Sequence, residues 1–191
     1  MSASSTSSAA STHRYFSTFE LLLLGMFAAL IVAGNFALRF PIRMPGHSGI
    51  VWMALLITAA TVVPKRGAAT TAAGLSGILA AFVGIGDKGP LDTVLSYAAA
   101  GVGVDVVLEI LRGRGRAASC VIAGAVGNLF KFAVKVLLEL WIGIPTGFVL
   151  LGRLYPAVTY LLFGLAGGYL GFLVVEALRR AGFFAYLAEK R

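Results

Sequence analysis

One cysteine, Cys120, and two histidines are all the thiol and imidazole groups in this chain of 191 residues. A single cysteine excludes an internal disulfide and a cysteine-rich metal site, so Cys120 is expected to be structural. Charged residues are scarce too, at 13% of the sequence, whereas soluble domains carry about 25%. The composition is therefore not that of a soluble globular protein.

Motifs for catalysis and for nucleotide binding are also missing. The sequence has no Gly-rich loop ending in Lys-Ser or Lys-Thr, so any ATP dependence must come from partner subunits. Its apolar segments hold no clustered aspartates of the kind used in phosphatidyl transfer, no Ser-His pair and no set of metal ligands. A membrane enzyme needs such a constellation. We therefore expect a protein that is not an enzyme and that binds no cofactor or metal of its own.

Apolar residues make up 59% of the sequence, and the mean hydropathy is +0.90. Apolar stretches of about 20 residues are long enough to cross a membrane as helices. We predict an all-α integral membrane protein: a single six-helix bundle over residues 15–191, preceded by a disordered cytoplasmic tail rich in Ser, Ala and Thr over residues 1–14. The six predicted transmembrane helices cover residues 19–38, 49–63, 67–86, 91–111, 117–142 and 154–178.

Basic residues set the predicted orientation of these helices. Outside the helices, ten lysines and arginines fall on one side of the membrane and four fall on the other. The positive-inside rule places the richer side, and with it both termini, in the cytoplasm. The poorer side holds Arg39, Arg43, Lys88 and Arg153. The net charge of +8 is thus a topology signal and does not predict nucleic-acid binding.

One face of the fifth predicted helix carries Asn128, Lys131, Lys135 and Glu139. At about 100° per residue, these positions lie within about 60° of each other and form one polar stripe. A charged side chain at the bilayer centre costs about 2.5 to 3.5 kcal/mol on insertion scales, so the stripe cannot face lipid. It predicts a substrate or ion site in the outer half of the membrane. The alternative is that the two lysines pair only with Asp92 or Glu139.

Other polar residues could complete the same site. On the fourth predicted helix, which runs in the opposite direction, Asp92, Ser96 and Tyr97 reach a comparable height in the membrane. Further candidate ligand contacts are Asn35 and Thr159 near helix ends and Arg43 and His47 in the first outer loop, with Trp52, Tyr155 and Tyr160 as additional aromatic candidates. Arg43 or His47 would meet an anionic group of the ligand. The aromatic candidates rank lower because aromatic residues at helix ends usually anchor a helix at the membrane interface.

Asp105 and Glu109 lie one turn apart in the inner half of the fourth predicted helix. They are within snorkelling reach of the basic loop 112–116, so we interpret them as structural. A second interpretation is a self-sufficient small transporter or channel, in which Lys131, Lys135, Asp105 and Glu109 form a relay across the membrane.

The two lysines of the polar stripe, Lys131 and Lys135, favour a small water-soluble ligand with a carboxylate, a phosphate or an electron-rich heterocycle. A cationic ligand ranks second.

Small residues recur every four positions in the first predicted helix, at Gly25, Ala29, Ala33 and Ala37. This spacing lets another helix approach closely, because packing drives helix association in lipid. The last predicted helix has a comparable surface, made of Gly164, Gly167, Gly168 and Gly171. We expect one of these two surfaces to be internal to the bundle.

Six predicted helices in 191 residues, the motif Ala29-x-x-x-Ala33 and the stretch Pro64-Lys65-Arg66-Gly67-Ala68 together resemble the substrate-binding S components of energy-coupling factor (ECF) transporters. The resemblance extends over nearly the whole chain. It implies a multi-pass protein of a prokaryotic cytoplasmic membrane that captures a vitamin, a vitamin precursor or a similar micronutrient beneath its outer loops. It also implies that the face of Ala29 and Ala33 docks on a membrane coupling (T) subunit, which two cytoplasmic ATPases drive.

The chain departs from one branch of that family. Metal-specific members carry a histidine directly after the initiator methionine, whereas this sequence has Ser2. Imidazoles are the usual protein ligands of nickel and cobalt. A transition-metal cargo is therefore not expected.

Overall fold

The computed structural model describes residues 16–37, 45–86, 89–143 and 152–189, and every regular element in these ranges is a helix. The helices are α1 (Thr18–Ala37), α2 (Gly49–Val62), α3 (Ala68–Phe82), α4 (Pro90–Ile110), α5 (Arg116–Trp141), α7 (Leu154–Arg180) and α8 (Phe183–Glu189). The first six lie within the predicted ranges or within two residues of them. The short α8 lies beyond the predicted helices.

Local sequence signals set several helix ends. The first turn of α1 is closed by a capping box, in which Glu20 N donates to Ser17 Oγ and Ser17 N donates to Glu20 Oε2, at 3.2 and 2.8 Å. Helix α4 starts with Pro90, whose missing N–H is tolerated at that position. After α7 the chain turns at Gly182, which has a φ of +74°. Only glycine adopts this conformation without strain, so α7 stops there.

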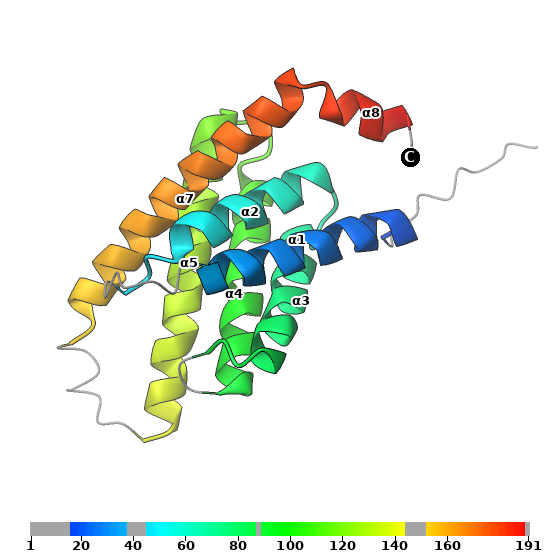
Figure 1. Ribbon diagram of the computed structural model, residues 1–191. Helices are drawn as coiled ribbons and strands as arrows, with labels where there is room; N and C mark the ends of the chain where they lie inside the picture. Colours follow the sequence, from blue (N-terminus) through cyan, green and yellow to red (C-terminus); the bar gives the residue numbers. More distant parts are fainter. Residues whose placement is uncertain (1–15, 38–44, 87–88, 144–151, 190–191) are drawn as a thin grey trace, which may run out of the picture.

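Helix α2 is the centre of the bundle. It packs against α1, α3, α5 and α7, and ten of its 14 residues are buried. Around it, α3 pairs with α4, α4 with α5, and α5 with α7, while α1 crosses α2 and α3 (Figure 1). A helix that is apolar on all sides is suited to this central place. Polar side chains that neighbouring helices turn toward α2 are therefore inside the protein.

The close contact between α5 and α7 depends on glycines. A Cβ added at Gly164 would lie 2.7 Å from the carbonyl oxygen of Gly124 and 2.9 Å from Ala125 Cα. A Cβ added at Gly168 would lie 2.5 Å from the carbonyl oxygen of Cys120. These distances leave no room for a side chain, so glycine permits the two backbones to touch. The glycine surface of α7 is therefore internal to the bundle.

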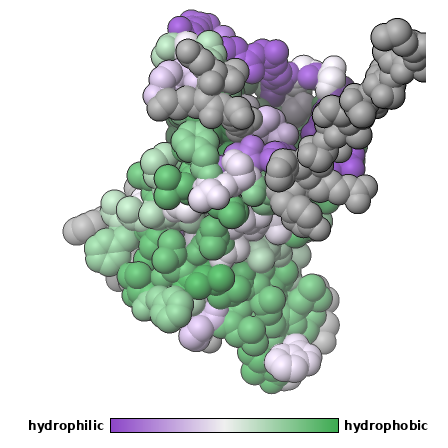
Figure 2. Space-filling view, turned by 90° about the vertical axis from the view of Figure 1, so that its right-hand side faces the viewer, coloured by the Kyte–Doolittle hydropathy of each residue, from purple (hydrophilic) through white to green (hydrophobic). Residues whose placement is uncertain are grey.

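The outer surface is that of a multi-pass membrane protein. Helices α1, α4, α5 and α7 are long and apolar enough to cross a membrane, and α2 and α3 are shorter apolar helices. Large apolar residues such as Leu22, Phe82 and Ile110 are at least 70% exposed, and extended exposed apolar surface marks contact with lipid or a partner. Figure 2 shows hydrophilic residues gathered at one end of a face that is otherwise mostly hydrophobic. Six membrane crossings with both termini inside remain a prediction.

Thiol labelling tests this topology. In a Cys120→Ala background, a cysteine at Ser48 is expected to react with an impermeant thiol reagent added to intact cells, and a cysteine at Arg114 is not. The predicted orientation places Arg114 on the cytoplasmic side of the membrane, which is richer in basic residues, and Ser48 on the outer side. Both cysteines should react after permeabilisation, because neither position is buried. Labelling of position 114 in intact cells would overturn the predicted orientation.

Candidate ligand-binding site

The ammonium group of Lys131 lies inside the bundle against two aromatic rings. Its Nζ is 4.4 Å from the centroid of the Trp52 ring and 4.6 Å from that of Tyr97, and the two rings are 5.0 Å apart. All three residues are buried, with Lys131 only 6% exposed. A desolvated cation–π contact contributes about 2 kcal/mol or more. We call Lys131 of α5, Trp52 of α2 and Tyr97 of α4 the lysine–aromatic cluster.

Helix α1 reaches the same cluster through Asn35, whose Nδ2 donates a hydrogen bond to the Tyr97 hydroxyl oxygen. Four helices therefore meet here. The structure brings together Asn35, Tyr97 and Lys131, three residues that the sequence predicts for one site. Trp52 is only an additional candidate in the sequence, because it lies near a helix end. Its burial follows from the central position of α2, which helix periodicity does not reveal.

A carboxylate is buried in the first turn of α4. Asp92 is 7% exposed, and Ser96 Oγ donates to Asp92 Oδ1 at 3.2 Å. Within the part of the chain that the structure describes, Asp92 Oδ2 has no hydrogen-bond partner. A buried acceptor left without a donor costs about 1 to 3 kcal/mol, and more if it is charged. Oδ2 is therefore suited to accept a hydrogen bond from a ligand.

Asn128 is fully buried one turn before Lys131. Its Nδ2 donates to the carbonyl oxygen of Tyr160 at 2.7 Å and so links α5 to α7. Asn128 Oδ1 and Trp52 Nε1 have no hydrogen-bond partner among the described residues. Together with Asp92 Oδ2, the site region holds two acceptors and one donor that a bound molecule could satisfy.

The far end of the polar stripe has a partner within the chain. The Glu139 carboxylate is 3% exposed and pairs with the guanidinium of Arg153, directly before α7. Such a pair offsets the cost of burying the carboxylate. Lys135, between Lys131 and Glu139 on the stripe, is half-buried. Along the stripe, Lys131 thus makes cation–π contacts and Glu139 makes an ion pair.

The outcome differs for each of three other residues that the sequence predicts to contact the ligand. Thr159 is buried, and its Oγ1 donates to the carbonyl oxygen of Pro156 at 2.8 Å, so the hydroxyl stabilises its own helix. His47 is half-buried in the turn before α2, where its carbonyl oxygen accepts from Ile50 N at 3.3 Å. Arg43 lies outside the described residues.

Asp105 caps a helix. Its Oδ1 accepts a hydrogen bond from Ala69 N at 3.1 Å, and its Oδ2 accepts from Thr70 N at 2.8 Å and Thr70 Oγ1 at 2.6 Å. These donors belong to the first turn of α3, whose N–H groups have no partner within the helix. Asp105 therefore fixes the start of α3 against α4, in agreement with its structural interpretation.

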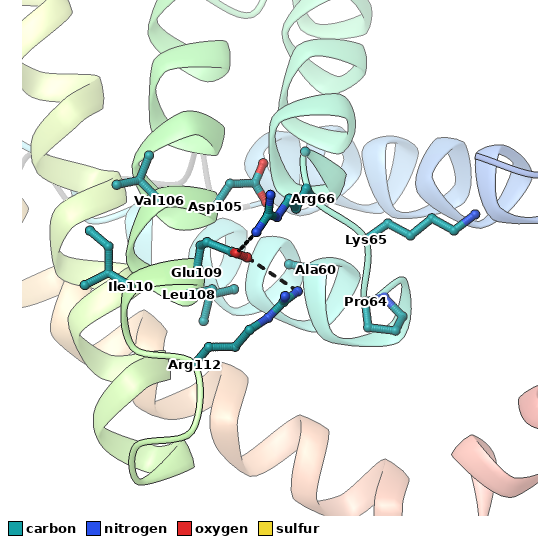
Figure 3. Close-up of a pocket in the computed structure, with 11 residues that line it drawn as sticks. Ala60, Pro64, Lys65, Arg66, Asp105, Val106, Leu108, Glu109, Ile110 and Arg112 are labelled. Atoms are coloured by element: carbon teal, nitrogen blue, oxygen red, sulfur yellow. Dashed lines mark hydrogen bonds and ion pairs between the residues drawn. The ribbon is translucent and has the colours of Figure 1, made fainter. Parts of the chain in front are cut away.

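Glu109 organises a cleft of about 510 Å³ at the end of α4, beside the turn between α2 and α3. The guanidinium groups of Arg66 and Arg112 converge on its carboxylate, while Lys65 points away from it (Figure 3). Lys65 pairs instead with Glu20 of α1 at 2.6 Å. The ionic groups of this cleft thus have partners within the chain, and the cleft lies at the opposite end of α2 from Trp52. These contacts support a structural role for Glu109.

The two surfaces of small residues differ in exposure. On α1, Ala29, Ala33 and Ala37 are exposed, and Gly25 is half-buried. A Cβ added at Gly25 would meet no atom of the described chain within 4 Å. The glycines of α7 are buried, as described above. The α1 stripe, which we define as Gly25, Ala29, Ala33 and Ala37, therefore lies on the surface of the bundle.

Comparison with known proteins identifies the fold. No family model and no curated protein matches the sequence. Among solved structures, the crystal structure of an S-component of an ECF transporter matches with a TM-score of 0.60. The match covers 93% of this chain and 95% of that chain, at 18% sequence identity. The resemblance inferred from the sequence is thereby confirmed at the level of the fold: this chain has the fold of an ECF transporter S-component.

Proposed function

We propose that this chain is the substrate-binding subunit of an ECF-type importer in the cytoplasmic membrane of a prokaryote. It captures a small water-soluble micronutrient, a vitamin or a vitamin precursor, from outside the cell. The observation that carries this proposal is the buried Lys131 with two polar atoms near it, Trp52 Nε1 and Asn128 Oδ1, that have no partner in the described part of the chain, inside an S-component fold. Buried polar groups are almost always hydrogen-bonded, so two such atoms in one region support a ligand site.

The same atoms and Asp92 Oδ2 narrow the chemistry of the ligand. Asp92 Oδ2 and Asn128 Oδ1 are acceptors, so the ligand carries N–H or O–H donors. Trp52 Nε1 is a donor, so the ligand also carries an acceptor. The Lys131 ammonium adds a charged donor for a carbonyl or carboxylate oxygen. A nitrogen heterocycle with amide-like N–H and C=O groups meets these requirements better than a cation or an anion without donors.

Energy for transport comes from partners in this proposal. The chain has no nucleotide-binding loop, so two ATPase subunits hydrolyse ATP and drive the coupling (T) subunit on which the chain docks. The exposed α1 stripe is the docking face for the T subunit, since its small side chains allow a helix to approach closely. The rival, a self-sufficient transporter or channel, would move its substrate without these subunits.

Larger side chains on the α1 stripe are expected to stop ligand uptake while leaving ligand binding intact. In the double variant Ala29→Leu/Ala33→Leu, two bulky side chains occupy the docking face, and ligand uptake into cells should fall about tenfold or more. Ligand affinity of the isolated variant should change less than about twofold, because both alanines are exposed and lie outside the lysine–aromatic cluster. The ATPase pair should co-purify with the wild-type chain and not with the variant.

A matched control uses exposed alanines of another helix. Ala166→Leu/Ala177→Leu adds the same bulk to α7 at exposed positions and should leave uptake near the wild-type level. Normal uptake by the α1 variant would remove the docking proposal. Uptake by the purified wild-type chain alone in vesicles would favour the self-sufficient transporter.

A further inference from the structure

A second cavity, of about 210 Å³, lies between the loop that joins α4 to α5 and the end of α7. Four arginines line it: Arg112, Arg114 and Arg116 from the loop and the start of α5, and Arg179 from the last turn of α7. Among its lining residues the only acid is Glu176. The cavity wall therefore carries a clear excess of positive charge.

The chain itself does not neutralise this excess. Glu176 already pairs with Arg180 at 3.4 Å, and Arg112 is drawn toward Glu109 in the neighbouring cleft (Figure 3). Arg114 and Arg116 make no ion pair with any described residue. Like charges gathered at one cavity repel each other. An anion bound between Arg114 and Arg116 would relieve this repulsion.

Hydrogen bonds hold the loop in a defined turn. Ser119 Oγ donates to the carbonyl oxygens of Leu111 and Gly115 at 3.3 and 3.2 Å, and Arg114 N donates to the carbonyl oxygen of Leu111 at 3.0 Å. Ser119 is buried and also lines the cavity. The first turn of α5 thus forms part of the wall, and the positive end of a helix favours an anion. The arginines are therefore carried by ordered backbone.

Much of the remaining lining is apolar. Leu108, Leu111, Phe172 and Val175 line it, and the neighbouring Ile110 is 70% exposed on the apolar outer surface. A free inorganic anion gains no favourable contact from such a lining. A phospholipid gains one, because its charged headgroup is joined to apolar chains.

We propose that this cavity binds the headgroup of an anionic phospholipid, with Arg114 and Arg116 contacting the phosphate and the apolar lining contacting the start of the acyl chains. Basic pockets between transmembrane helices bind the headgroups of anionic lipids in this way. The cleft around Glu109 makes a useful contrast: it shares Arg112 and Leu108 with the cavity, yet its charges are paired within the chain. The lipid site shares no lining residue with the lysine–aromatic cluster.

Lipid titration of the full-length chain in neutral detergent, followed by native mass spectrometry, tests the proposal. The wild type should bind phosphatidylglycerol in preference to phosphatidylcholine. Arg114→Gln/Arg116→Gln should weaken phosphatidylglycerol binding about thirtyfold, since each basic side chain near a membrane surface contributes about a factor of five. The charge-preserving Arg114→Lys/Arg116→Lys variant should keep most of the affinity, which a misfolded protein would not.

The control removes the same charge from the same end of the bundle. Arg66→Gln alters an arginine that is 79% exposed and does not line the cavity, and it should change phosphatidylglycerol affinity less than about twofold, against about fivefold for the single variant Arg114→Gln. Equal losses in these two single variants would show general charge attraction and overturn the site. Displacement of the lipid by inorganic phosphate alone would assign the cavity to free phosphate, and equal binding of phosphatidylcholine would exclude an anion site.

Discussion

Lys131→Met is expected to weaken ligand binding at least about tenfold. Methionine is close to lysine in length and keeps the apolar contact with Trp52 and Tyr97, but it lacks the ammonium group. A lost hydrogen bond from a charged group costs about 1.5 to 3 kcal/mol, and about 1.4 kcal/mol corresponds to a factor of ten. Mass spectrometry of small molecules released from the purified wild type identifies the ligand, and calorimetric titration then compares the variants.

Stability separates a ligand contact from a structural role. Lys131→Met removes the cost of burying a charge together with the cation–π contact, and these two effects oppose each other, so its melting temperature should stay close to that of the wild type. Asp92→Asn should weaken binding by a similar factor, because it replaces an acceptor while keeping the shape of the side chain. Leu137→Met, on the exposed face of α5, is the control with normal binding. Normal affinity in Lys131→Met, or its failure to fold, would show that Lys131 is structural.

Gly164→Ala is expected to destabilise the bundle by about 1 to 3 kcal/mol, the usual cost of overpacking a core. The added Cβ meets backbone atoms of α5, which cannot turn aside as a flexible side chain can. The two helices must separate, and Asn128, whose Cβ would lie 2.9 Å from the new methyl group, must move with α5. Thermal unfolding in detergent measures the loss, and reduced ligand affinity should accompany it.

Gly74→Ala is the matched control on α3. A Cβ added there meets no described atom within 4 Å. Alanine is a better helix former than glycine by up to about 1 kcal/mol, so this variant should be as stable as the wild type or more stable. Equal melting temperatures for Gly164→Ala and Gly74→Ala would contradict the tight α5–α7 contact.

Hydropathy predicts the helix positions well because each long helix is bounded by turn residues or charges. The residues 49–63 predicted for the second helix, for example, become Gly49–Val62. The third helix shows the limit, since the prediction extends to residue 86 and α3 ends at Phe82. There Gly84 adopts a φ of +70° and Ile85 N donates to the carbonyl oxygen of Ala80 at 2.8 Å. Apolar residues continue through this turn, so hydropathy detects no end.

Periodicity predicts which residues share a face, but not which helix they meet. The face of Asn128 and Lys131 is therefore predicted, whereas the aromatic contact of Lys131 with Trp52 depends on α2 lying at the centre. Two carboxylates show the same limit. Asp105 caps the start of α3, and Glu139 pairs with Arg153 from beyond the next loop. Such contacts join residues of separate helices, and no local pattern encodes them.

The short length of α2 has a consequence for access. Its 14 residues span about 21 Å, whereas the hydrocarbon core of a bilayer is about 30 Å thick, and any tilt shortens this reach further. With the end that leads to Lys65 at one membrane surface, the Gly49 end stops below the other surface. Polar backbone at that depth is tolerated only inside protein or beside water. The turn at His47, which is half-buried, therefore needs either covering protein or water that reaches down to it from the membrane surface.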